Sequence, residues 1–240
     1  MHTKTEKAYS SIEQLKPYID QCATYAGETH VEELQQRSAT LPMAAERLLL
    51  SQIGEKRFYK AQKILQKTTG LNLQQIQHLR PMLISSLIDQ SLLPQNGRIV
   101  ALDQYLWQYA KSKDKTLSGI ETVEDQIAVF DQLDQKTELK ALLSTISNIS
   151  RHRKNLLKTL DWYEQQDIQQ LYRSTQKNLG QWRYLLLKKR NHRMANSIHT
   201  LCTDRSSFCT VGAAHLAGKE GVLRLLKVKG FRVRAVIVKP

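Results

Sequence analysis

Three side chains that can do acid, base or metal chemistry lie at or just after the ends of short segments that could be strands. His215 lies three residues after Gly212 in "FCTVGAAH", Glu28 ends "ATYAGE", and Glu121 ends "SGIE". Ligands of an open α/β sheet bind at the carboxyl ends of its strands, so we expect the three side chains to share one edge. Gly212 lets the backbone approach a ligand closely. The same residues also suit a turn histidine bonded to backbone and two solvated acids, and spacing alone leaves both interpretations open.

The familiar catalytic motifs are missing from the chain. It contains no HExxH, no Walker loop, no GxSxG and no GxGxxG. Any chemistry at His215 therefore has to be argued from the elements that position it.

The elements around these residues predict a helix-rich α/β protein. Strands are expected near residues 25, 118, 210 and 235, with helical regions at about 34–115 and 123–203 inserted between them. At the end of the chain "FCTVG" predicts a strand, Lys219–Lys229 a helix stopped by Gly230, and "FRVRAVIV" a last strand. This strand–helix–strand order is typical of a parallel pair. We therefore expect a small, mostly parallel sheet in one domain spanning residues 1–240.

Composition agrees with a helical globular protein. The 240 residues include only 10 Gly and 5 Pro, and the net charge is +14. That charge permits nucleic acid, anionic membrane or an acidic partner, but it is spread along the whole chain. The three cysteines form no CxxC pair, which favours a reducing compartment. No apolar run is long enough to span a bilayer, and no signal peptide follows Met1. A cytoplasmic location is therefore the default expectation.

Three segments together resemble the TraB/PrgY/GumN family, which includes the animal Tiki proteases. "TVGAAHLAGKEGVLRLLKVKGFRV" is similar to its VGAxHLxGxxGxxxLLxxxGxxV motif, "SGIETVEDQ" to its GLETxxxQ segment, and "KKRNHRMA" to its R-N-xx-M-A segment. The resemblance covers nearly the whole chain in order. The glycines that it marks as structural are Gly119, Gly212, Gly218, Gly221 and Gly230.

The resemblance implies a metal-dependent hydrolase, peptidase-like, on a scaffold related to the erythromycin-esterase and ChaN-like folds. Family members carry two GxxH motifs and a glutamate, which here correspond to His2, His215 and Glu28. Such a set suits Mn, Co or Zn, and a peptide or protein substrate is implied. Arg190 or Arg193 would neutralise a developing oxyanion or a substrate carboxylate. Glu121 would either orient a ligand or act as a general base.

The sequence departs from the family at its first motif. Where relatives have GT-M/I-H after a strand, this chain has only Met1 and His2. We interpret this as a late start or a fragment, in which the first motif is incomplete and activity can be lost. An upstream segment would make a periplasmic or membrane-anchored location possible. A sheet without its first strand would expose an edge, which predicts a homodimer.

Two other functions remain open at this stage. One is a non-enzymatic protein that binds or sequesters a peptide signal, as proposed for the pheromone-shutdown members of the family. The other is nucleic-acid binding through basic helices, including the cluster at residues 151–154. We regard nucleic acid as a less favoured partner than a peptide or protein.

Overall fold

The centre of the molecule is a parallel sheet. The computed structural model describes residues 6–33, 48–94 and 100–236, and within them the sheet has three strands: β1 (Thr24–Thr29), β2 (Thr116–Glu121) and β3 (Ser207–Cys209). Their order is β2-β1-β3, and both pairs are parallel, with Thr24 opposite Thr116 on one side and Ser207 on the other. The three carboxyl ends therefore lie at one edge. A helix-rich α/β class with a small parallel sheet is confirmed.

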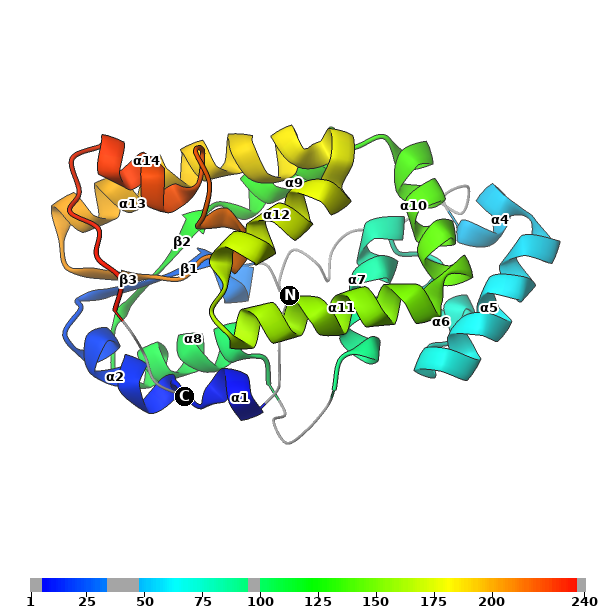
Figure 1. Cartoon of the computed structure of the whole chain (residues 1–240), viewed down its shortest axis with the longest axis horizontal. Coiled ribbons are helices and arrows are strands. Elements are labelled where there is room, and N and C mark those ends of the chain that lie inside the picture. Colours follow the sequence, from blue (N-terminus) through cyan, green and yellow to red (C-terminus); the bar gives the residue numbers. More distant parts are fainter. Residues whose placement is uncertain (1–5, 34–47, 95–99, 237–240) are drawn as a thin grey trace.

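Helices cover both faces of the sheet (Figure 1). On one face lie α1 (Glu6–Tyr9), α2 (Ile12–Asp20) and α8 (Leu102–Ser112), and on the other lie α13 (Arg190–Asp204) and α14 (Val222–Val228). Side-chain alternation along β1 serves both layers, because Tyr25 packs with Ile19 and Trp107, whereas Ala26 packs with Met194 on the opposite side. Glu28, two residues after Ala26, consequently faces α13.

A second core lies within the helical regions. It is built by α4 (Leu49–Ile53), α5 (Glu55–Thr69), α6 (Leu73–Ile76), α7 (Pro81–Leu92), α10 (Gln135–Ser147) and part of α11 (Ile149–Glu164). Phe58, Leu65, Ile84 and Leu142 are all nearly inaccessible there. Pro81 is the first residue of α7, where its missing N–H costs nothing. This lobe extends away from the sheet in Figure 1.

The remaining elements return the chain to the third strand. After β2 a Thr122–Asp125 capping box starts α9 (Val123–Asp131) directly, as the sequence predicts. The later elements are α12 (Ile168–Leu179), the 3₁₀ turn η2 (Gly180–Trp182) and the π-helical turn η3 (Tyr184–Lys189), which runs into α13. π-Helical turns are rare in proteins, and those that do occur are often found at functional sites. This one immediately precedes Arg190.

The expected last strand is wrong. Residues 231–236 form no strand, and residues 237–240 lie outside the described part of the chain. Gly230, at φ 93°, and Phe231 instead donate their N–H groups to the carbonyls of Lys227 and Leu226, which closes α14 with a Schellman motif. The Phe231 ring then packs against His199. The alternating pattern is left without a partner strand, and most of these residues are exposed.

Two further expectations from the sequence concern the cysteines and membrane-spanning helices. All three cysteines are free thiols. Among the described helices, none combines the length and the apolar character that a bilayer span requires.

Candidate functional site

The carboxyl edge of the sheet gathers ionisable residues from four segments. Glu28 lies near the end of β1, Glu121 ends β2, His215 ends the 3₁₀ turn η4 (Ala213–His215) after β3, and Arg190 opens α13. Parallel pairing brings the strand ends together, and α13 crosses over them.

Arg190 joins the two carboxylates. Its Nε and Nη2 donate to Oε2 of Glu121 at 2.9 and 2.5 Å, and Nη2 also donates to Oε1 of Glu28. Only 13% of the Arg190 side chain is exposed, and that of Glu121 is fully buried. A buried guanidinium and carboxylate stabilise each other only while paired, so Arg190 fixes the positions of both glutamates.

Arg193 completes the burial of Glu121 from the next turn of α13. Its Nη2 donates to Oε1 of Glu121 at 3.2 Å, and its Nη1 donates to Asp125 at 2.9 Å. Residues three apart lie on the same face of a helix, which is why Arg190 and Arg193 reach one carboxylate. Both oxygens of Glu121 are thus engaged by arginines. This geometry is that of a positioning residue rather than of a free general base.

His215 is held in one orientation by Asn191. Nδ1 of His215 lies 2.6 Å from Oδ1 of Asn191, whose Nδ2 donates to the carbonyl of Glu220 at 2.7 Å. That second bond assigns the amide orientation, so the Asn191 oxygen accepts and the His215 Nδ1 must carry the proton. The lone pair is then on Nε2. Both side chains are buried, at 6% and 1% exposed for the two residues.

The pKa values match this arrangement. Burial lowers the pKa of His215 to about 4, against the opposing effect of the Glu28 charge, so the imidazole is neutral at neutral pH. For Glu28, partial burial acts to raise the pKa, but the Arg190 charge and hydrogen bonds from Arg190 and the Gly212 N–H outweigh it and hold the pKa below its ordinary value. The site therefore presents a neutral imidazole and an ionised carboxylate.

The Gly212 loop brings these two groups together. A Cβ on Gly212 would lie 3.4 Å from both Oε2 of Glu28 and Cδ2 of His215. Further along, Gly218 has φ 95° and sits against the Tyr172 ring, where a Cβ would come within 2.2 Å. A Cβ on Gly221 would clash equally closely with the Ala217 carbonyl. These glycines permit the tight loop that carries His215.

Gly119 plays the same role in the sheet. A Cβ at this position would lie 2.7 Å from the Glu121 carbonyl and 2.9 Å from the backbone nitrogen of His30. Only glycine allows β2 to pass this close to β1 just before Glu121.

The structure thus brings together five of the residues singled out from sequence: Glu28, Glu121, Arg190, Arg193 and His215. His2 lies outside the described residues. Within the described part of the chain, no group of three His, Cys, Asp or Glu side chains is placed to hold a metal ion.

Two contributors were missed by sequence reasoning. Asn191 orients His215, and Asp125 pairs with Arg193. Both occur in the motif segments "KKRNHRMA" and "ETVEDQ", next to residues that were selected. Their position in those segments is the signal that could have identified them, because the Asn191 amide and the Asp125 carboxylate do not stand out by chemistry alone.

Fold and site together define a class: a helix-rich α/β protein with an ionised glutamate and an oriented neutral histidine at the carboxyl edge of a parallel sheet. The model of the TraB/PrgY/gumN family matches residues 1–235, and the chain belongs to this family. Comparison with curated proteins and with solved structures gave no match.

Proposed function

We propose that this protein is a metal-dependent hydrolase that acts on peptides. The observation that supports this most is the pairing of Asn191 with His215, which leaves the lone pair on Nε2 of a histidine whose ring lies in the neighbourhood of the ionised Glu28. Metal-binding histidines are typically oriented in this way by a hydrogen bond to their other nitrogen. A histidine that served packing alone would not need the Nδ1–H tautomer to be enforced.

The residues at the edge of the sheet fit a divalent cation. Ligands must be deprotonated, and both Glu28 and His215 are in that state at neutral pH. They supply two of the three protein ligands that catalytic zinc sites use, and we assign the third to His2, with Mn, Co or Zn as the candidate ions. When bound, such a cation lowers the pKa of water and polarises a scissile carbonyl.

The remaining residues prepare this site. Arg190 holds Glu28 in place and balances its charge, and Glu121 holds Arg190 through two hydrogen bonds. Arg193 neutralises the other oxygen of Glu121. We therefore assign Arg190, Arg193 and Glu121 to positioning Glu28, and the chemistry to Glu28 and His215.

Metal titration and peptide cleavage test the proposal. The full chain, treated with EDTA, is titrated with Mn²⁺, Co²⁺ and Zn²⁺ by calorimetry and then incubated with a peptide mixture that is analysed by mass spectrometry. We expect one ion per chain and cleavage that is lost in His215→Ala and in Glu28→Gln. His78→Ala, an exposed histidine in the helical lobe, is the matched control. Cleavage that survives His215→Ala refutes the proposal.

A second candidate is a non-enzymatic protein that binds a peptide signal. Arg190 already pairs with Glu28 and Glu121, and Arg193 pairs with Glu121 as well, so the two carboxylates have partners without a metal ion. The same experiment separates the candidates. Peptide retained intact, with no stoichiometric divalent ion, supports the binding protein.

We also propose that the chain forms a homodimer. Among the described residues β2 and β3 pair only with β1, so each has one edge that carries no strand. Light scattering of the purified chain tests this, and a monodisperse monomer contradicts it.

A further inference from the structure

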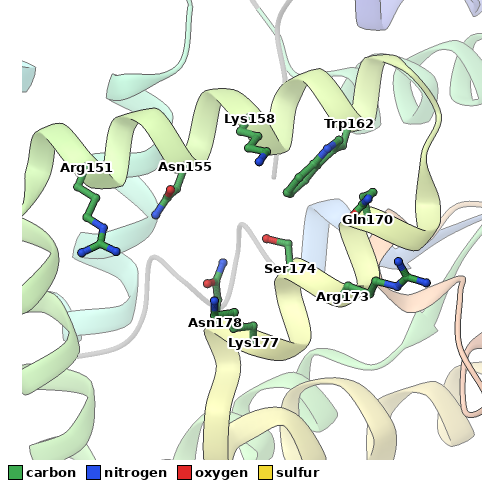
Figure 2. Close-up of a pocket in the computed structure, with 9 residues that line it drawn as sticks. All are labelled: Arg151, Asn155, Lys158, Trp162, Gln170, Arg173, Ser174, Lys177 and Asn178. Atoms are coloured by element: carbon green, nitrogen blue, oxygen red, sulfur yellow. The ribbon is translucent and has the colours of Figure 1, made fainter.

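The helices α11 and α12 flank a polar pocket that is open to solvent. Its volume is about 520 Å³, within the range of about 300–1,000 Å³ that is usual for small-molecule sites. In Figure 2, Lys158 and Trp162 of α11 and Ser174 and Asn178 of α12 point toward the space between the two helices. The pocket plays no part in the site described above.

The α11 wall is a single stripe of the helix. Arg151, Asn155, Lys158 and Trp162 are spaced by four, three and four residues, which places them on one face. Eleven residues of helix separate the first from the last, so the wall is about 16 Å long. A ligand that filled it would be elongated.

The α12 wall is a second stripe. It consists of residues at helical spacing that line the pocket from the α12 side, namely Gln170, Arg173, Ser174, Lys177 and Asn178. Gln170 lies beside Trp162 near the closed end of the hairpin (Figure 2).

The lining is made almost wholly of hydrogen-bond donors. It contains four cations, Arg151, Lys158, Arg173 and Lys177, together with three amides and one hydroxyl, and no carboxylate. Lysine and arginine side chains donate and cannot accept. The lining therefore matches a ligand that is anionic, extended and rich in acceptor oxygens. Phosphate groups in a row have that chemistry.

Trp162 adds a flat apolar surface to this basic lining. Its ring lies under the Lys158 ammonium, which is 5.1 Å from the ring centroid. An indole at one end of a basic cleft suits a ligand with a planar ring at one end and phosphates along its length, because bases stack on aromatic side chains.

The pocket is separate from the His215 site although α12 borders both. Tyr172, on the opposite face of α12 from Ser174 and Lys177, packs against Gly218 in the loop that follows His215. The pocket stripe faces away from that loop. A ligand there would contact none of the residues assigned to hydrolysis.

We propose that this pocket binds a nucleotide, with the base against Trp162 and the phosphates along the four cations. The site is independent of the proposed hydrolase activity. The nucleotide is either free or part of a single strand, since both present the same base and phosphate chemistry.

Calorimetry on the full chain at low salt tests the site with three probes: ATP, inorganic tripolyphosphate and a short single-stranded oligonucleotide. We expect Arg173→Gln/Lys177→Gln to weaken ATP binding by about tenfold or more, since two phosphate contacts are removed. Trp162→Leu should weaken ATP binding about tenfold and leave tripolyphosphate unchanged. All three side chains line the pocket rather than the core, and circular dichroism checks that the variants fold.

The matched control is Arg153→Gln/Lys154→Gln, which makes the same charge change at exposed positions of α11 outside the pocket. We expect this pair to change affinity less than about threefold. Equal loss in both pairs overturns the proposal, because binding would then follow the overall charge of +14. The proposal is also overturned if the chain binds neither ATP nor the oligonucleotide. It is equally overturned if Trp162→Leu changes the affinity for neither of these two probes. Binding of the oligonucleotide alone supports the site and identifies a strand as the source.

Discussion

The hydrogen bond between Asn191 and His215 makes the most direct prediction, because it can be measured without a substrate. Asn191→Ala removes the acceptor for Nδ1–H of His215 and the donor to the Glu220 carbonyl. Leaving a buried donor unsatisfied costs about 1–3 kcal/mol, and the partly buried carbonyl adds a smaller loss. We expect the free energy of unfolding to fall by about 2–4 kcal/mol.

A double-mutant cycle isolates the pair. In a His215→Ala background the Asn191 oxygen has already lost its partner, so Asn191→Ala should cost less there by about 1–2 kcal/mol. Urea denaturation of the four proteins, followed by circular dichroism, measures each value at constant pH with EDTA present.

The control for this cycle is Asn196→Ala on the same helix. Asn196 is exposed, so its replacement should change stability by less than about 0.5 kcal/mol. If Asn191→Ala and His215→Ala add within about 0.5 kcal/mol, the two side chains are not coupled and the assigned tautomer is refuted.

Three further predictions concern stability. Gly218→Ala should cost more than about 2 kcal/mol, because its methyl group would meet Tyr172 at φ 95°, whereas Gly70→Ala, at φ 73° in open space, should cost about 1 kcal/mol. Tyr25, whose pKa burial raises from 10.0 to about 12, stabilises the fold below pH 10, and that contribution falls as pH rises to 12. The wild type should lose about 3 kcal/mol more than Tyr25→Phe over that interval. Glu121→Gln should cost about 3 kcal/mol, because buried guanidinium groups lose their counter-charge.

Urea denaturation measures all three. Equal losses in the two glycine variants contradict the packing argument for Gly218. Parallel pH profiles of the wild type and Tyr25→Phe contradict the assigned pKa. The control for Glu121→Gln is Asp131→Asn, because Asp131 is an exposed partner of Arg80. We expect Asp131→Asn to change the free energy of unfolding by less than about 0.5 kcal/mol. A larger change would contradict the role that we assign to burial.

The local elements could be read from the sequence because local chemistry decides them. The capping box at Thr122 and the C-terminal glycine of α14 each need only their neighbours. The strand predicted at residues 231–238 failed for the opposite reason, since residues 231–236, the described part of it, form no strand. A strand requires a partner edge elsewhere in the chain, and the backbone there closes a helix instead.

The sequence by itself determined which residues could meet: Glu28, Glu121 and His215 follow strands, and parallel strands end at one edge. Only the tertiary structure decided what each of them does. Burial between two arginines occupies both carboxylate oxygens of Glu121, and contact with Asn191 puts the lone pair of His215 on Nε2. These properties depend on burial and on partners 24 to 72 residues away, which no spacing along the chain encodes.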